Sequence, residues 1–416
     1  MNDQNLNPSG LPALSDRDVI DVDVVIQGAG PAGATLACCL AGAGIRVAML
    51  DRMDLGSMEA PAFDGRAYAI AAGARVLLER AGIWQLLPWP VGPIDEIRIS
   101  DGKVGRRASP LFLHFDQKEA GQGSFGWMVE ARALRIAINR RIAQLPNLQL
   151  FAPVEAEIAF NDDAIKAQII GGPCLRASLA VGADGRRSKL REQAGIGLVT
   201  LPYGQSGIVC AVAHEKPHNN VALEHFLPGG PFAQLPMHGT ELAPHLSALV
   251  WTERTSFAAR LMALPDDVFI REALRRLGPH LGAIRLVGPK WSYPLTLQHA
   301  SRYVDRRLAL IADAAHGMHP IAGQGLNVGF RDVESLVELL TDAHRAGGDL
   351  GDVALLAAYE SRRRPDNLKM LLATDLLDRL FSSNNPLLRL ARDVGIASVH
   401  RLPGLKKRFM REAMAK

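Results

Sequence analysis

The sequence has few cysteines, few aromatic residues and little net charge. Its 416 residues include 4 cysteines, 6% aromatic residues and a formal net charge of +4. No pair of cysteines has the C-x-x-C spacing of a metal or redox site, and no extended Lys or Arg run occurs before the C-terminus. So weak a charge does not favour a nucleic-acid partner. We expect the cysteines to be small, buried apolar residues in a reducing cytosol.

The sequence also lacks an apolar run long enough to cross a membrane. The longest candidate, residues 22–50, is interrupted by Gly28-Ala29-Gly30-Pro31, whereas a spanning helix needs about 20 continuous apolar residues. Residues 1–18 are polar and lack the basic start and apolar stretch of a signal peptide. We therefore expect a mobile arm over residues 1–20 and a cytoplasmic protein.

What is present is an ordinary globular composition with alternating strand and helix patterns. The chain has 48% hydrophobic and 22% charged residues, and its length suits two or three domains. Short β-branched runs are typical of buried parallel strands, and apolar residues at helical spacing indicate helices. The expected strands are Asp23–Gln27, Arg46–Leu50 and Leu308–Ala312, and the expected helices are Ala32–Ala43, Ala69–Ala81, Arg132–Leu145 and Gly325–Leu340.

Residues 201–297 have a different residue pattern, with short segments separated by Pro and Gly turns, as in Phe226–Pro231. This pattern is typical of an antiparallel sheet. Because parallel-type strands occur on both sides of it, we expect a discontinuous α/β domain with this β-rich region inserted. From Leu355 onward the sequence indicates mostly amphipathic helix.

The motif Gly28-Ala29-Gly30-Pro31-Ala32-Gly33 follows a predicted strand and opens a predicted helix. Gly28 permits a tight turn, Gly30 lets a pyrophosphate approach the backbone, and Gly33 allows close packing of helix and strand. Asp51 ends the next strand, where an acidic residue accepts a ribose hydroxyl. The context favours dinucleotide binding over a merely structural glycine turn.

A second match to G-x-G-x-x-G, Gly121–Gly126, is preceded by polar residues rather than by a buried strand. The motif therefore fails its context requirement, and we expect a loop there. Only one dinucleotide-binding fold is visible in the sequence, so a second domain for a nicotinamide is disfavoured.

Two later motifs also place an acidic residue after a short apolar run. Asp184 lies in Val181–Ser188, and Asp313 follows the strand that ends near Ala312. A Gly-rich loop, His319–Asn327, then precedes a helix, so its backbone N–H groups could face an anion.

In this order, the three motifs resemble those of class A FAD-dependent aromatic monooxygenases, which have a p-hydroxybenzoate-hydroxylase-like fold. The closer resemblance is to the ubiquinone-biosynthesis hydroxylase family. It covers nearly the whole chain after Asp21, and the loop block His-Pro-x-Ala-Gly-Gln-Gly-Leu-Asn is its most specific part. The other segments that carry it are Phe63–Ala67, Ala81–Trp84, Phe226–Pro228, Gly230–Ala233, Ala314–His316, Tyr359, Arg362–Arg363 and Leu380–Ser382.

The resemblance implies an α/β fold with a discontinuous Rossmann-like FAD-binding domain, an inserted antiparallel substrate domain and C-terminal helices. The FAD-binding domain would comprise residues 21–80, 105–200 and 298–345. The substrate domain would comprise residues 81–104 and 201–297, and the C-terminal helical region residues 346–416.

It also implies roles for individual residues around FAD. Gly28, Gly30, Gly33 and Asp51 would hold the ADP half, and Arg52 would join that part of the site. Arg66 would reach the FAD phosphates. Asp184 would support the pyrophosphate region and a nicotinamide donor, and Asp313 would bind ribityl or phosphate-side oxygens. The residues expected to line the isoalloxazine ring are Pro320, Gly323, Gln324, Gly325, Leu326 and Asn327, of which Pro320, Gly323, Gln324 and Gly325 would act in catalysis.

The sequence departs from the family pattern at Ala312, where the family usually has Gly before the Asp. An added methyl there could crowd the cofactor. The sequence does not identify a base that would activate a phenol.

The implied reaction is hydroxylation of the aromatic ring of a polyprenylated phenol in ubiquinone biosynthesis. It uses O₂ through a flavin hydroperoxide, with electrons from NAD(P)H or a redox protein. Two alternatives stay open: a flavin-dependent polyprenyl reductase, and a non-catalytic FAD-binding subunit of a biosynthetic complex. Further partners to consider are a ubiquinone-biosynthesis complex and a membrane.

Three smaller features have competing interpretations. His316 and His319 have a spacing compatible with a metal pair, but no further ligands lie nearby, so packed or hydrogen-bonded histidines and no metal are expected. Arg132 could touch FAD or lie on a solvated helix face. The C-terminal basic segment Lys406–Arg411 could lie on the cytoplasmic face of a membrane or form an ordinary solvated helix face.

Overall fold

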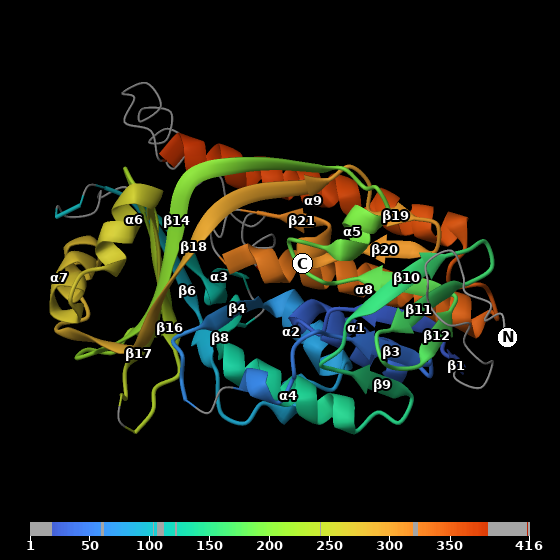
Figure 1. Ribbon diagram of the computed structural model, residues 1–416. Helices are drawn as coiled ribbons and strands as arrows, with labels where there is room; N and C mark the ends of the chain where they lie inside the picture. The colour runs from blue at the N-terminus through green and yellow to red at the C-terminus, as the bar shows by residue number, and fades with distance from the viewer. Residues whose placement is uncertain are drawn as a thin grey trace, which may run out of the picture.

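A computed structural model describes residues 19–59, 62–102, 104–105, 112–120, 123–241, 243–318, 323–381 and 414. In Figure 1 a large sheet stands on the left, a helix-covered α/β domain fills the right, and one long helix runs across the top. The expected α/β fold with an inserted antiparallel sheet is confirmed by the order of the strands. Residues 1–18 of the expected arm lie outside the described residues, while Val19 and Ile20 belong to a strand.

The α/β domain is built on a six-stranded sheet of order β19-β20-β13-β2-β3-β9. All its pairs are parallel except β19 with β20. Apart from Gln27 at the end of β2, the central strands β20, β13, β2 and β3 contain no polar side chain, as expected for a sheet that is covered on both faces. The bounds are β2 Val24–Gln27, β3 Val47–Leu50, β9 Leu148–Phe151, β13 Leu179–Gly182, β19 Val304–Asp305 and β20 Leu308–Leu310.

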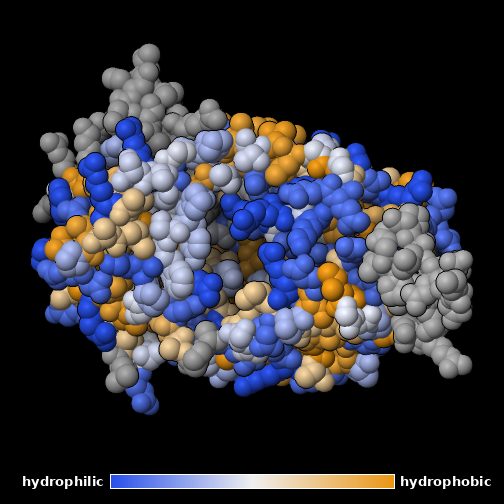
Figure 2. All heavy atoms as spheres, viewed as in Figure 1, coloured by the Kyte–Doolittle hydropathy of each residue, from blue (hydrophilic) through white to orange (hydrophobic). Residues whose placement is uncertain are grey.

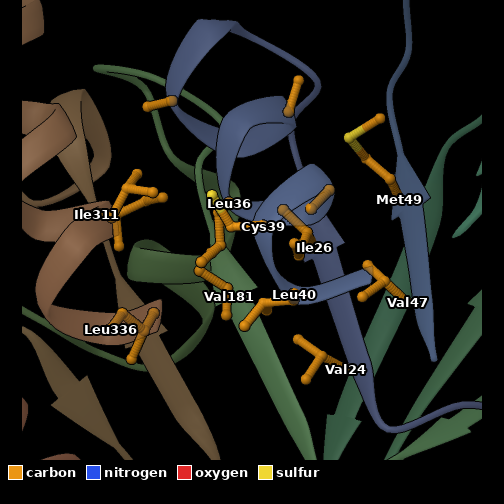
Figure 3. Close-up of a cluster of buried hydrophobic side chains, with 14 of the residues drawn as sticks. Val24, Ile26, Leu36, Cys39, Leu40, Val47, Met49, Val181, Ile311 and Leu336 are labelled. Atoms are coloured by element: carbon orange, nitrogen blue, oxygen red, sulfur yellow. The ribbon is translucent and has the colours of Figure 1, made fainter. Parts of the chain in front are cut away.

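Helices α1 (Pro31–Gly42) and α8 (Gln324–Arg345) pack together in the main core. Figure 3 shows their side chains with those of the strands: Leu36 and Leu40 lie beside Ile26 and Val181, and Leu336 approaches from α8. α1 is rich in Ala and Cys, so its backbone can lie close to the sheet. Cys38, Cys39, Cys174 and Cys210 are free and buried, as expected, and burial raises the pKa of Cys38, Cys39 and Cys210 to about 12.

The inserted region, together with β6, β7 and β21 from outside it, forms an eight-stranded sheet of order β21-β18-β14-β17-β16-β15-β6-β7. β14 and β18 are long and bent, and both extend from this sheet toward the α/β domain (Figure 1). Helices α6 (Thr255–Met262) and α7 (Asp266–Leu277) cover its outer face. The strands are β6 Glu96–Asp101, β7 Phe112–Asp116, β14 Leu198–His214, β15 Val221–Leu227, β16 Gly230–Met237, β17 Leu246–Arg254, β18 Ile284–Ala300 and β21 His316–Gly317.

A small three-stranded sheet, β4-β8-β5, contacts the inner face of the large sheet. Its strands are β4 Ala67–Ala71, β8 Gly126–Glu130 and β5 Gly92–Ile94. Residues 69–71 were expected to be helical, but they pair with β8, and helix α2 (Ala72–Arg80) begins only after them. Pairing between strands distant in sequence overrides the local helical pattern here.

The strand pairing also crosses the expected domain boundaries: β21, from the segment assigned to FAD binding, pairs with β18 in the large sheet, and β7 and β5 pair across the boundaries as well. β7 lies within the segment assigned to FAD binding, yet it pairs with β6 in the large sheet. β5 lies within the expected substrate segment, yet it pairs with β8. A separate four-stranded sheet, with β1 pairing parallel to β12, contains β1 Val19–Asp21, β10 Ala156–Phe160, β11 Ile165–Ile169 and β12 Cys174–Ala177.

The remaining described helices are α3 Gln117–Ala120, α4 Ala131–Ala143, α5 Lys189–Gln193 and α9 Val353–Phe381, with short 3₁₀ turns at η2 Ser57–Glu59, η3 Trp84–Leu86 and η4 Ala312–Ala314. α9 is the expected C-terminal helix and crosses the top of the molecule (Figure 1). No described helix combines the length and apolar character needed to span a bilayer.

Candidate functional site

The first glycine motif forms the turn between β2 and α1. Gly28 has φ +109°, and a Cβ there would meet the Ala183 carbonyl oxygen at 2.3 Å. A Cβ on Gly33 would meet the Gly28 carbonyl oxygen at 2.1 Å. A Cβ on Gly30 would meet no protein atom within 4 Å. Gly28 and Gly33 are therefore required by the packing of the turn itself, whereas Gly30 faces open space at the N-terminus of α1.

Asp51 and Arg135 hold this turn from two sides. The Ala29 N–H donates to Asp51 Oδ2 at 2.7 Å, and the Met53 N–H donates to Oδ1 at 2.8 Å. Arg135, on α4, is buried and donates to the Ala29 carbonyl oxygen at 2.9 Å. Burial lowers the pKa of Arg135. The sequence did not single out Arg135, because one Arg on a predicted helix gives no sign of pointing inward.

Two other arginines, Arg52 and Arg66, were expected near the cofactor, and the role of Arg132 was left open. Arg66 pairs with Asp64 at 2.6 Å and lies over the Trp291 ring. Arg52 is exposed directly after β3. Arg132 donates to Glu130 at 2.8 Å and stacks over Trp89, so it is not simply solvated. The cofactor contacts expected of Arg66 and Arg52 stay predictions.

The second and third acidic motifs meet at one edge of the six-stranded sheet. β13 and β20 are paired neighbours, so the residues that follow them lie side by side. Arg186 Nε lies 3.5 Å from Asp313 Oδ2. Arg191 donates to the Ala314 and Arg186 carbonyl oxygens at 3.0 and 3.1 Å, which ties the two loops together.

Ala312 adopts a left-handed backbone conformation, with φ +51°. Its methyl lies beside Gly329 on α8: a Cβ on Gly329 would be 2.8 Å from the Ala312 Cβ. The methyl that departs from the family pattern therefore lies against a glycine of α8.

A buried polar network fixes the turn that carries Asp313. Asp332, on α8, is fully buried and accepts hydrogen bonds from the Ala312 N–H at 3.0 Å and from His316 Nε2 at 2.5 Å. Its other oxygen accepts from Arg363 at 2.9 Å and from Asn367 at 3.0 Å, both on α9. Burial would raise the pKa of Asp332, but His316 and Arg363 outweigh it and lower the pKa to about 2.

This network confirms the interpretation of His316 as a buried, hydrogen-bonded residue. His319 lies outside the described residues, as does Pro320. The described residues contain no group of three or more His, Cys, Asp or Glu side chains arranged to hold a metal ion.

The end of the Gly-rich loop enters α8. Gly323 is the N-cap residue, with φ +63°. Asn327 donates to the Ala69 carbonyl oxygen at 2.9 Å and accepts from the Ala71 N–H at 2.9 Å, so it ties the loop to β4. A Cβ on Gly325 would meet no atom within 4 Å. Gly323, Gln324, Gly325, Leu326 and Asn327 thus sit together at the N-terminus of α8, beside the small sheet.

An apolar layer joins this loop region to the large sheet. Ala72, Met128 and Ile94 from the small-sheet side pack against Ala211, Ala213, Ala222, Met237, Leu246 and Ala248 from the large sheet. Met414 is buried in the same layer, and its carbonyl oxygen accepts from the Gly73 N–H at 2.9 Å. Figure 2 shows the surface hollowed between the two parts of the molecule, with apolar residues on its floor.

Comparisons with known proteins agree with this arrangement. A family model described as "FAD binding domain" matches residues 21–88 and 138–373. The ubiquinone hydroxylase UbiL of Rhodospirillum rubrum is 52% identical over 97% of this chain and 91% of its own length. The chain belongs to the family of FAD-dependent ubiquinone hydroxylases.

Other similar proteins extend the comparison. The 3-demethoxyubiquinol 3-hydroxylase of Escherichia coli is 30% identical, over 94% of this chain and 98% of its own length. The crystal structure of p-nitrophenol 4-monooxygenase PnpA from Pseudomonas putida superposes with a TM-score of 0.75 at 19% identity. The superposition covers 95% of this hydroxylase and 98% of the PnpA chain. It shows that the two proteins share a fold.

The described residues of this flavoenzyme fit FAD. Open space in front of Gly30 and Gly325 leaves room at the N-termini of α1 and α8, where backbone N–H groups favour an anionic ligand. Asp184 Oδ1 and Gln324 Oε1 are buried without a hydrogen-bond partner among the described residues. Buried polar atoms are normally paired, so both are suited to contact a cofactor. Which atoms of FAD each residue contacts stays a prediction.

Proposed function

We propose that this FAD-dependent monooxygenase hydroxylates the aromatic ring of a polyprenylated phenol that is a precursor of ubiquinone. The observation that carries the proposal is the 52% identity to the UbiL ubiquinone hydroxylase across nearly the whole of both chains. The apolar layer beside the α8 loop supports it, because a phenol with a hydrocarbon tail needs an apolar site next to the flavin.

The protein's part in the reaction is binding, orientation and exclusion of water. When bound, FAD supplies the activation of O₂ and the electrons that hydroxylation requires. Gly30 and Asp51 would hold its ADP half, and Gln324 and Gly325 would face its ring system. The N-terminus of α8 carries about half a positive charge, so it would stabilise negative charge on that ring system. The apolar layer would keep water from the reacting atoms.

Quinone intermediates in a strain that lacks this protein test the proposal. We expect mass spectrometry to show a prenylated phenol that lacks one hydroxyl, and we expect the wild-type gene to restore the normal profile. A normal ubiquinone profile in the deletion strain would contradict the proposal, unless a second hydroxylase of the same strain is shown to replace it.

Two assays on the purified protein separate the alternatives. A hydroxylase consumes O₂ when a phenolic substrate and a reductant such as NAD(P)H or a reduced redox protein are added. A polyprenyl reductase would instead reduce double bonds of the chain without using O₂. A non-catalytic subunit would show neither reaction, although it would still carry FAD.

We further propose that the protein contacts the cytoplasmic surface of a membrane through α9 and the C-terminal segment. Leu368, Leu372 and Leu376 form a stripe along α9 and are 42%, 59% and 66% exposed. Three leucines exposed at a four-residue spacing lie on one helix face, and the substrate is itself a lipid. The basic segment Lys406–Arg411 lies outside the described residues.

Co-sedimentation with anionic vesicles tests this contact. Replacement of Leu368, Leu372 and Leu376 by Gln should reduce binding, and so should neutralisation of Lys406, Lys407, Arg408 and Arg411. The exposed Val76 on α2 offers a matched control, since Val76→Gln should leave binding unchanged. Equal sedimentation of all variants would count against membrane contact and favour a protein partner in a biosynthetic complex.

A further inference from the structure

The buried carboxyl of Glu224 lies on the face of the large sheet that forms the apolar layer. Side chains alternate along a strand, so Ala222, Glu224 and Phe226 of β15 share one face. Ala222 packs in the apolar layer, whereas Leu223 and Leu227 pack on the opposite face against α6 and α7. Glu224 therefore points toward the layer between the two sheets.

The strands that flank Glu224 confirm this orientation. Glu224 pairs with Ala233 of β16 and with Ile99 of β6. Ile99 contributes to the same apolar layer, as do Leu235 and Met237, which share a face of β16 with Ala233. Glu224 is thus surrounded by apolar neighbours on its own sheet.

The layer is lined by small side chains where it faces the α/β domain. Ala211, Ala213, Ala222, Ala233 and Ala248 lie on this face of the large sheet. The opposite face has large side chains at neighbouring positions, including Phe232 and Trp251. Small side chains on this face take up little of the space between the large sheet and the α/β domain, which is the kind of surface that a flat ring needs.

The other wall of the layer leads to the flavin loop. Ala67 and Ala69 of β4 pack in this layer, and Asn327 bonds to the Ala69 carbonyl oxygen at 2.9 Å. A Cβ on Gly323 would lie 3.1 Å from the Ala69 Cβ. The layer therefore extends from the N-terminus of α8 to the strand that carries Glu224.

The described residues give Glu224 no partner that would explain a buried acid. It is 8% exposed, and among the described residues nothing forms an ion pair or hydrogen bond with its carboxyl. Burial raises its pKa to about 7. Hydrophobic residues of β4, α2, β5 and β8 pack against this face, and Asp101, at the end of β6, lies in register on the same face.

We propose that Glu224 is the base that takes the phenolic proton of the substrate, an inference that rests on the proposed hydroxylase function. The phenol O–H bond breaks, the proton moves to a Glu224 carboxylate oxygen, and the electron pair stays on the phenolate oxygen. That pair delocalises into the ring and makes the carbons ortho and para to the oxygen more nucleophilic. After hydroxylation the attacked carbon loses its hydrogen as a proton, which goes to the water formed from the second oxygen atom of O₂. The original phenolic oxygen takes its proton back from Glu224, so the carboxylate is restored as the product leaves.

A base with a pKa near the working pH is the most effective one for such a transfer. A carboxylate in an apolar layer is also strongly basic toward a hydroxyl that hydrogen-bonds to it, because the described part of the layer offers it no other partner.

The test compares Glu224→Gln with the wild-type holoenzyme, using a phenol with one short prenyl chain as the probe. We expect the variant to keep its FAD and its KM, while kcat falls about 10²- to 10⁴-fold, the usual contribution of a general base. The fall of kcat at low pH that the wild type shows should be absent in the variant. Mixing the probe with the oxidised wild-type enzyme should give the ultraviolet difference band of a phenolate, and this band should be absent with Glu224→Gln.

Two controls make the outcome decisive. Asp101→Asn removes a carboxyl from the same sheet face and should leave the phenolate band in place. A more acidic, fluorinated phenol should shrink the loss caused by Glu224→Gln, because it needs less help to ionise. If the wild type hydroxylates the probe and Glu224→Gln does so equally fast with the same phenolate band, the base assignment is wrong. If the wild type itself does not hydroxylate any prenylated phenol, the proposed function has failed instead.

Discussion

At the scale of single residues, the glycines of the first motif divide into two groups with different expected mutants. Gly28→Ala puts a Cβ against the Ala183 carbonyl oxygen at 2.3 Å and demands φ +109° from an alanine, so the turn should not form as it stands. Gly30→Val meets no protein atom near its Cβ, so the protein should fold but lose FAD. Flavin absorbance per folded protein measures this. A folded Gly30→Val protein with full FAD would contradict the placement of the cofactor.

Glu224 also gives a prediction about stability and pH. Its pKa is raised from 4.5 to about 7. Between these values the unfolded chain releases a proton that the folded protein retains, so stability falls as pH rises from about 4.5 to about 7. Glu224→Gln removes this cost. It should stabilise the protein by about 3 kcal/mol at pH 8, from 1.36 kcal/mol per pKa unit, and leave stability at pH 4 unchanged.

Urea unfolding at the two pH values checks this prediction. The same gain at pH 4 and pH 8 would mean that the carboxyl is not the source of the effect. A loss at pH 8 would mean that Glu224 is charged and stabilised in the folded protein.

Substitutions at Ala312 and Gly329 should affect stability non-additively, because a Cβ added to Gly329 would lie too close to the Cβ of Ala312. Gly329→Ala would place its Cβ 2.8 Å from the Ala312 Cβ, and overpacking of this kind costs about 1–3 kcal/mol. Ala312→Gly removes that contact and relieves the left-handed φ of +51°. The double variant should therefore recover most of the stability that Gly329→Ala loses. Additive effects in a thermal-melt cycle would show that the two positions do not touch.

The roles of some single residues could be predicted from the sequence, and those of others could not. The turn roles of Gly28 and Gly33 could be assigned because their motif dictates a particular turn, whereas the ribose contact expected of Asp51 stays a prediction. The roles of Arg135 and Glu224 could not be assigned, since only the pairing of distant strands and helices decides that an Arg points at a carbonyl or an acid at an apolar layer.

At the scale of elements, Asp332 joins α8, α9 and the turn that carries Asp313. Asp332→Asn keeps the shape of the side chain but removes its charge. Arg363 and any protonated His316 then lack their buried partner, and breaking such a pair lowers the free energy of unfolding by about 3–5 kcal/mol. Asn offers one acceptor oxygen in place of two, so the Ala312 N–H must compete for it with Arg363 and Asn367, and FAD affinity should fall as well.

The control is Glu253→Gln, which breaks a buried pair between β17 of the large sheet and Arg276 of α7. It should lower the melting temperature without changing the FAD dissociation constant. Equal FAD affinity in Asp332→Asn and wild type, measured well below both melting temperatures, would show that the network only stabilises the fold. The wild-type pKa of about 2 lies below the unfolded value of about 3.9, so this stabilisation should be present above pH 4 and fade as pH falls toward 2.

Elements were predictable where their pattern is local. The βαβ unit, α4 and α8 follow from β-branched runs and helical spacing, and their observed ends differ from the expected ones by a few residues. β4 was not predictable, because Ala69–Ala71 have no local β pattern and become a strand only by pairing with β8.

At the scale of the whole molecule, the insertion of a β-rich region into an α/β domain could be recognised from the change in residue pattern near residue 201. The pairing of β5 in the small sheet and of β7 in the large sheet could not be recognised, because the packed layer decides which strands far apart in the sequence become partners. The same holds for that layer, which is assembled from the large sheet, the small sheet, α2 and the residue Met414 near the chain end.

The most direct test of the central claim is a single-turnover reaction of the reduced holoenzyme with a prenylated phenol under ¹⁸O₂. The account predicts that the product gains one hydroxyl on its aromatic ring, that this oxygen carries the label, and that the prenyl chain is unchanged. Unlabelled oxygen in the product, or a product with a reduced chain and no new hydroxyl, would contradict it.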